Sequence, residues 1–143
     1  TWILGFQCIG FAIGMASKSN LDAWYLTINK STLTPPDFVF PIVWTLLYII
    51  LSFCGYLIFK EKSKSIRWIF CIAMILNWAW SPIFFNAHLV NLAFFVIVML
   101  LLLNLTLMKQ CYKKIKAVTY LLMPYVCWLS FAAYLNFFIV LHN

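Results

Sequence analysis

Long apolar runs, separated by short polar or basic connections, are the feature that most limits what this chain can fold into. Of the 143 residues, 66% are hydrophobic, and only three are acidic. A water-soluble domain of this length has too much surface to cover with so few charged groups. A soluble protein with an unusually apolar core is therefore excluded, and the sequence predicts an integral membrane protein.

The apolar runs predict five helices in one domain covering residues 1–143, an all-α five-transmembrane-helix bundle. We expect them at about residues 1–16, 38–59, 66–85, 92–108 and 118–141. The first run is short for a span of about 20 residues, so we expect residues upstream of Thr1 to complete it. It lacks the basic region and cleavage site of a signal peptide, which favours a retained helix.

Positive charge is concentrated in two of the connections. Most of the ten Lys and Arg residues lie there: Lys60, Lys62, Lys64, Arg67, Lys109, Lys113, Lys114 and Lys116. The positive-inside rule places such connections in the cytoplasm. With five spans, the N-terminus is then cytoplasmic, and the loop 17–37 and the C-terminus face the other side. We expect contact with anionic lipid headgroups and no nucleic-acid binding, because there is no separate basic domain.

The stretch from Pro35 to Tyr48 turns a polar loop into a long apolar helix. Pro35 and Pro36 favour an extended approach, and Pro41 is tolerated in the first helical turn. Trp44 and Tyr48 are four residues apart and therefore share a helical face. This pattern fits the wall of a binding cavity, and it fits an aromatic belt at the membrane interface equally well.

Small and polar residues mark two further helical faces. Trp80 lies beside Asn77 and Ser81, and an amide inside hydrocarbon costs free energy unless it bonds a neighbouring helix or a ligand. Trp128, Ala132 and Asn136 recur every four residues in the last helix.

Glycine and proline give two more local expectations. Gly10 and Gly14, with Gly5 extending the stripe, predict the close approach of another helix, from this chain or from a second copy. Pro82 is expected to disturb the end of the third helix.

Groups suited to acid–base or metal chemistry are missing from the expected spans. The carboxylates Asp22, Asp37 and Glu61 lie outside them, and His88 lies in a tight turn with no second ligand near it in sequence. The five cysteines form no CxxC pair, which argues against a disulfide framework or a zinc site. Ion-coupled transport would place an ionisable residue within the membrane. We therefore expect no metal, no cofactor and no acid–base or nucleophilic catalysis.

Aromatic residues make up 20% of the chain. A pocket of this composition suits a large, flat, mostly apolar molecule, held by stacking and buried area. The alternative is that the rings only pack the bundle and mark its interfaces, which we favour for Trp2 and Trp68.

Several blocks of sequence carry a resemblance to a known family. They are Trp24-Tyr25 with Lys30, Pro35 to Tyr48, Leu76 to Phe85, and Pro124 to Asn136. In this order they resemble the translocator protein family, also called TspO/MBR, the tryptophan-rich sensory proteins or peripheral-type benzodiazepine receptors. The resemblance implies a five-helix membrane bundle, commonly dimeric, with a ligand cavity closed by the first loop. Family members bind porphyrins such as protoporphyrin IX, and many bind cholesterol and isoquinoline carboxamide or benzodiazepine ligands.

Matching motif positions imply which residues line the ligand site: Trp24, Phe40, Trp44, Tyr48, Asn77, Trp80, Trp128 and Ala132. The chain departs from the family in its loop, where Ser31 follows Lys30 and neither Leu33 nor Phe38 is the tryptophan common there. Residues 137–143 also lack the Tyr-plus-basic cholesterol motif of animal members. Steroid import is therefore not expected.

The sequence thus predicts a membrane receptor or carrier for tetrapyrroles, with a regulatory role in tetrapyrrole transport or stress signalling. Two alternatives stay open. One is an enzyme that degrades porphyrin in light through Trp44 and Trp128, and the other is a structural membrane-protein partner without a ligand. We expect a homodimer in a bacterial membrane, with the mitochondrial outer membrane as the alternative location.

Overall fold

The computed structural model describes residues 4–13, 27–36 and 38–143, and all regular structure in this part of the chain is helical. An N-terminal helix (Leu4–Ile13) is followed by the elements α2 (Val39–Lys60), α3 (Lys64–Ser81), the π-helix η2 (Pro82–Asn86), α4 (Val90–Lys114) and α5 (Lys116–His142). Four segments are long and apolar enough to cross a membrane, namely α2, α3 with η2, α4 and α5. The predicted all-helical membrane bundle is confirmed.

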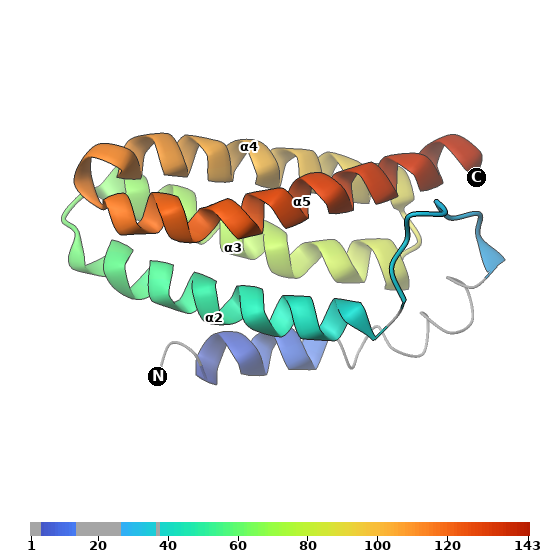
Figure 1. The fold of residues 1–143 in the computed structure, drawn as a ribbon, viewed down its shortest axis with the longest axis horizontal. Coiled ribbons are helices and arrows are strands. Elements are labelled where there is room, and N and C mark those ends of the chain that lie inside the picture. The colour runs from blue at the N-terminus through green and yellow to red at the C-terminus, as the bar shows by residue number, and fades with distance from the viewer. Residues whose placement is uncertain (1–3, 14–26, 37) are drawn as a thin grey trace.

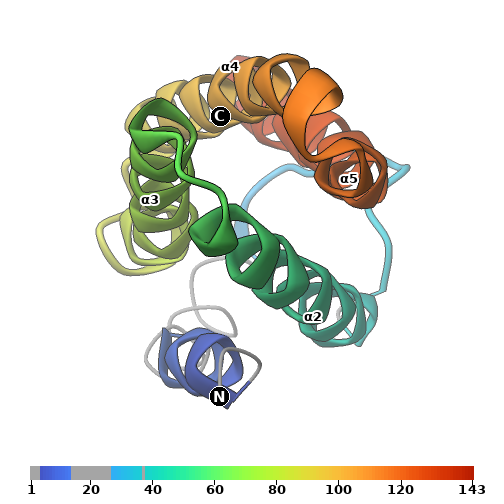
Figure 2. The ribbon, with the colours of Figure 1, turned by 90° about the vertical axis from the view of Figure 1, so that its left-hand side faces the viewer.

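The helices run back and forth along one axis (Figure 1). Viewed from the end, α3, α4, α5 and α2 follow one another around the bundle (Figure 2). Helix α4 packs along both α3 and α5, whereas α2 packs mainly on α5 and little on α3. The seam between α2 and α3 is therefore the least closely packed junction of the bundle.

The N-terminal helix covers this seam. The Phe6 ring meets the rings of Phe70 and Trp78 on α3, with centroids 6.3 and 5.4 Å away. On the other side, Gln7 Nε2 donates to the carbonyl oxygen of Thr45 on α2 at 2.8 Å. The N-terminal helix thus contacts both α2 and α3, which make few contacts with each other.

Helix boundaries differ most from prediction at the second basic connection. The predicted loop between residues 108 and 118 is wrong, because α4 continues to Lys114 and α5 begins at Lys116. Lysine is a good helix former, and cations are favourable in the last turn of a helix. The polar ends of these helices therefore stay helical beyond the apolar run.

The third span begins earlier than the predicted residue 66 and changes its helix type near its end. Ser63 caps α3, because its hydroxyl accepts from the Ile66 N–H at 3.5 Å. Pro82 has no N–H to donate, and the chain continues from it as the π-helix η2. The Ala87 N–H then reaches the Pro82 carbonyl at 3.0 Å. The disturbance that the sequence predicts at Pro82 is therefore the change from the α-helix α3 to the wider π-helix η2.

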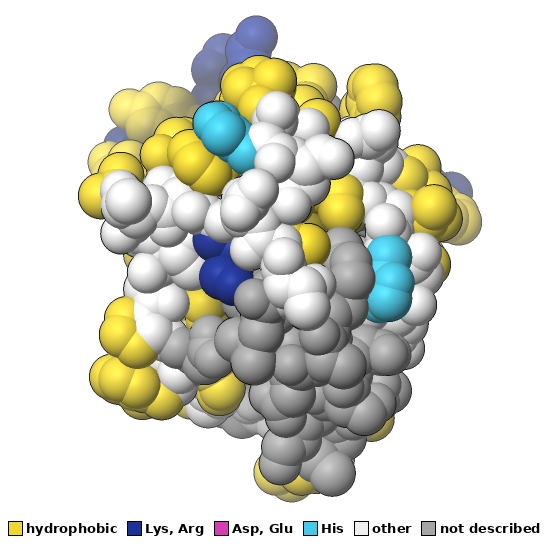
Figure 3. All heavy atoms as spheres, turned by 90° about the vertical axis from the view of Figure 1, so that its right-hand side faces the viewer, with side chains coloured by type: hydrophobic (Ala, Val, Ile, Leu, Met, Phe, Trp, Pro, Cys, Tyr) yellow, Lys and Arg dark blue, Asp and Glu magenta, His cyan; other side chains and the backbone are white. Residues whose placement is uncertain are grey.

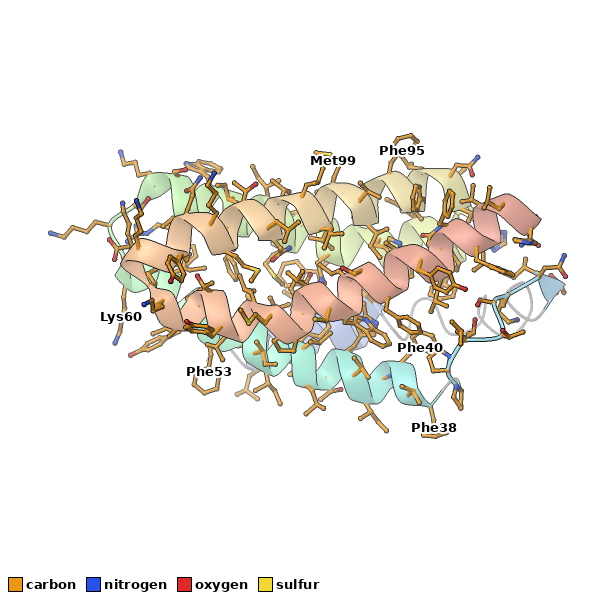
Figure 4. All side chains as sticks on the ribbon, turned by 45° about the horizontal axis from the view of Figure 1, so that its top comes forward. Phe38, Phe40, Phe53, Lys60, Phe95 and Met99 are labelled. Atoms are coloured by element: carbon orange, nitrogen blue, oxygen red, sulfur yellow. The ribbon has the colours of Figure 1, made fainter. Side chains whose placement is uncertain are left out.

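Apolar packing fills the bundle interior, and large side chains cover its outside. The most deeply buried residues include Leu51, Leu100, Leu107, Leu122 and Leu129. By contrast, Phe53, Phe95 and Met99 point away from the bundle, with at least half of each side chain exposed (Figure 4). An apolar exterior of this kind is what a lipid environment requires.

Both basic clusters lie at the same end of the bundle. The α2–α3 connection and the α4–α5 turn meet there, opposite the segment 27–36 and the end of α5 (Figure 1). Glu61, the acidic residue that the structure describes, also lies in the α2–α3 connection. At the opposite end, the described side chains are mainly apolar or uncharged polar, with some basic and histidine side chains among them (Figure 3).

Asn136 on α5 provides the clearest test of how the helices are held together. Its Oδ1 accepts from Trp80 Nε1 at 3.2 Å, and its Nδ2 donates to the Val90 carbonyl at 3.1 Å. We expect Asn136→Ala to lower the free energy of unfolding by about 1 kcal/mol, the range of such bonds inside membranes. Unfolding in mixed micelles measures this. Asn91→Ala, at an exposed position of α4, is the control; equal stability of the two variants would contradict the expectation.

Candidate ligand-binding site

Aromatic rings from α2 and α5 meet near the end of the bundle that carries the segment 27–36. The Trp128 ring makes edge-to-face contacts with Phe40 (centroids 5.9 Å apart) and Trp44 (6.4 Å). Trp44 also lies 5.8 Å from Tyr48, and Trp128 lies 5.7 Å from Phe131. We call these five residues the aromatic cluster. Pairs of this kind contribute about 0.5–1.5 kcal/mol each beyond the area they bury.

The sequence produces the cluster through simple helical spacing. Phe40, Trp44 and Tyr48 recur every four residues and line one face of α2. Trp128 and Phe131 are three residues apart on α5, so their side chains also share a face. Because α2 packs mainly on α5, these two aromatic faces meet.

Trp128 Nε1 is buried and has no hydrogen-bond partner among the residues that the structure describes. A buried donor without an acceptor costs free energy. Trp78 Nε1 shares this state, but Trp78 lies on α3 against Phe6 of the N-terminal helix. Within the aromatic cluster, Trp128 therefore offers a donor to an incoming acceptor.

A chain of buried hydrogen bonds borders the aromatic cluster. The Tyr48 hydroxyl donates to Asn77 Oδ1 at 2.9 Å, and Asn77 Nδ2 donates to the Tyr125 hydroxyl. All three residues are buried. The chain links α2, α3 and α5, and it shows that the amide of Asn77 is satisfied by neighbouring helices.

Trp80 and Ala132 occupy positions beside the cluster. The Trp80 indole bonds Asn136 and stacks on Phe84 of η2, with centroids 5.0 Å apart. The Trp80 ring also meets the Phe85 ring of η2 edge to face, and its apolar part packs against the main core. Ala132 is half-buried on α5, one turn after Trp128, and packs on the same core. Trp24 lies outside the described residues.

The segment 27–36 is tied to the end of α5 by polar contacts. The Asn29 N–H donates to Asn143 Oδ1 at 2.9 Å, and Asn143 Nδ2 donates back to the Asn29 carbonyl at 2.9 Å. The hydroxyls of Ser31 and Tyr134 lie 2.9 Å apart. Because Tyr134 stacks on Phe131 at 6.5 Å, this segment is connected to the aromatic cluster.

Sequence reasoning missed two members of this arrangement, Tyr125 and Phe131. Each lies three residues from Trp128, so helical spacing places both beside it. They did not stand out because aromatic residues are common throughout the chain. The partners of Tyr125 come from two other helices, which spacing within one helix cannot reveal.

Neutral groups dominate the chemistry of this region. Its described residues offer ring faces and edges, hydroxyls, amides and the Trp128 N–H, which has no partner among them. Among the described residues, no group of three or more His, Cys, Asp or Glu side chains could hold a metal ion. The arrangement can bind by stacking, buried area and a few hydrogen bonds.

Comparison with known proteins gives a consistent result. A model of the TspO/MBR family matches residues 2–141. The chain is 33% identical over 141 residues to "Tryptophan-rich protein TspO" of Chlorobaculum tepidum, covering 94% of this chain and 89% of that protein. It is 31% identical to "Tryptophan-rich protein TspO" of Archaeoglobus fulgidus, covering 99% and 94% of the two chains. It is 30% identical to "Translocator protein" of Homo sapiens, covering 80% and 71%.

The family match spans nearly the whole chain, and the apolar helices are those of a multi-pass integral membrane protein. The chain therefore belongs to the TspO/MBR family.

Proposed function

We propose that this protein is a membrane receptor or carrier that holds a porphyrin-like tetrapyrrole against the aromatic cluster. The observation that carries the proposal is the state of Trp128. Its ring makes edge-to-face contacts with rings of α2, while its buried N–H has no partner among the described residues. A porphyrin is flat and mostly apolar, and its edge carboxylates are acceptors for such a donor.

The contact between α2 and α5 is where a flat molecule enters in this proposal. The edge-to-face contact of Trp44 with Trp128 bridges the two helices. A tetrapyrrole inserted there replaces ring–ring contacts with ring–ligand contacts of similar kind. The bonds among Tyr48, Asn77 and Tyr125 provide a rigid polar boundary for the site.

The names of relatives support a transport or sensory role for the bound state. Relatives carry the names "Translocator protein" (Sus scrofa) and "Tryptophan-rich sensory protein" (Cereibacter sphaeroides). In this proposal, tetrapyrrole binding serves transport or stress signalling rather than catalysis. The neutral hydrogen-bonding groups around the aromatic cluster agree with binding as the main task.

Binding is tested by titrating the purified protein with protoporphyrin IX in the dark. We expect quenching of tryptophan fluorescence and a shifted porphyrin absorption band. Trp128→Phe removes the donor and should weaken binding about tenfold, and Ala132→Trp should weaken it at least as much by filling space beside Trp128. The control is Trp68→Phe, because Trp68 is 67% exposed on the outside of α3. Unchanged affinity in both site variants would remove this region from the binding site.

The same complex distinguishes a receptor from a light-dependent enzyme. Trp44 and Trp128, the two candidates for porphyrin photochemistry, are in contact. During illumination, we expect the main absorption band of the bound porphyrin to decline no faster than that of free porphyrin in the same detergent. Faster loss that requires both Trp44 and Trp128 would instead establish degradation.

We further propose that the basic end of the bundle faces the cytoplasm and contacts anionic headgroups of a bacterial membrane. Cations from both clusters lie at this end, and some rest over tyrosine rings, as Lys60 does over Tyr56 at 4.3 Å and Lys116 over Tyr112 at 5.1 Å. Such pairs are suited to the interface between lipid and water.

Orientation is tested by labelling with a membrane-impermeant maleimide in intact bacterial cells. We expect Leu33→Cys, in the exposed segment opposite the basic end, to be labelled above the wild-type background. Lys62→Cys, in the α2–α3 connection, should be labelled only after the cells are opened. The reverse pattern would contradict the proposed orientation.

A further inference from the structure

Gly10 of the N-terminal helix lies directly against the ring of Tyr48. A Cβ atom built at Gly10 would be 2.5 Å from Tyr48 Cε2, 2.9 Å from Cδ2 and 3.2 Å from Cζ. Contacts below 3.0 Å are essentially never seen for real Cβ atoms. Glycine is therefore the residue that lets this helix and the Tyr48 ring occupy their present positions together.

The Tyr48 ring is also held on its other sides. Its hydroxyl donates to Asn77 at 2.9 Å, and its ring lies 5.8 Å from that of Trp44. The residue is buried within the main core. A methyl group at Gly10 requires either the ring edge or the N-terminal helix to shift. Because Phe6 and Gln7 hold that helix in place, we expect the ring edge to move. That movement disturbs the bond to Asn77, the contact with Trp44, or both.

The N-terminal helix is itself anchored to both sides of the α2–α3 seam. Phe6 contacts Phe70 and Trp78 on α3, and Gln7 bonds the Thr45 carbonyl on α2. These contacts lie about one helical turn before Gly10, and they fix the position of the N-terminal helix there. The anchored helix thus acts as a fixed wall behind the Tyr48 ring.

We infer that Gly10 is a positioning residue for the candidate site. Through Gly10, the N-terminal helix sets the orientation of Tyr48 and with it the hydrogen bond to Asn77 and the place of Trp44. The site on α2 and α5 is then coupled to the helix that covers the α2–α3 seam. The ligand arm of this inference rests on the proposed tetrapyrrole binding, whereas the structural arm does not.

The structural arm is tested by thermal unfolding of the ligand-free protein in detergent. Gly10→Ala is expected to lower Tm, and Gly5→Ala is the matched control, since nothing lies within 4 Å of a Cβ at Gly5. Both changes add one methyl group to the same helix, so their intrinsic helix propensities change alike. In a Tyr48→Ala background the ring is gone, and Gly10→Ala should then cause no further loss.

The ligand arm uses protoporphyrin IX titration of the same variants. Gly10→Ala should weaken binding about fivefold, the equivalent of one lost hydrogen bond, while Gly5→Ala binds like wild type. In the Tyr48→Ala background, Gly10→Ala should leave the affinity unchanged. This dependence on Tyr48 separates positioning from a general loss of structure.

Clear results would overturn the inference. One is that Gly10→Ala keeps the Tm and the porphyrin affinity of wild type. The other is that Gly10→Ala lowers Tm and affinity equally with and without the Tyr48 ring. If Gly10→Ala fails to fold, the double variant with Tyr48→Ala must restore a folded protein, and its failure to do so also refutes the inference. If wild type binds no porphyrin, the proposed function fails, while the thermal arm still decides the role of Gly10.

Discussion

Hydrocarbon offers no hydrogen-bond partners, so each polar atom inside this bundle must find one within the protein. Two buried amides meet this requirement by joining helices. Asn77 accepts from α2 and donates to α5, and Asn136 accepts from α3 and donates to α4. The four long helices are thereby connected through two side chains. The aromatic cluster can be held in a defined place because these bonds fix the faces around it.

One exception to this rule lies within the aromatic cluster. Trp128 presents a buried N–H without an acceptor among the described residues, beside rings that can separate and stack on a flat molecule. Stacking and apolar burial are tolerant of the exact ligand, whereas a single donor selects for an acceptor at its edge. A site of this kind binds a class of flat molecules and orients them. Such binding does not require a charged group.

Much of this could be read from the sequence, because it follows from periodicity within single helices. The apolar runs located the helices, and four-residue spacing placed Trp44 with Tyr48 and Trp128 with Ala132 on common faces. Contacts between helices could not be derived in this way. The role of Tyr125 and the neighbour of Gly10 depend on which helices pack together, and that is a property of the folded bundle. The end of α4 was missed for a different reason, because a run of lysines looks like a loop although it continues a helix.

The unequal lengths of the spans affect how the protein sits in its bilayer. At about 1.5 Å per residue, the 22 residues of α2 extend about 33 Å and the 27 residues of α5 about 40 Å. A hydrocarbon layer of about 30 Å matches the first of these and falls short of the second. Figure 1 shows α5 extending past the start of α2 at the end that carries the C-terminus, so the extra length of α5 lies on that side of the bundle. Bilayer thickness would then act mainly on this C-terminal end of α5 and on the segment 27–36 that is hydrogen-bonded to it.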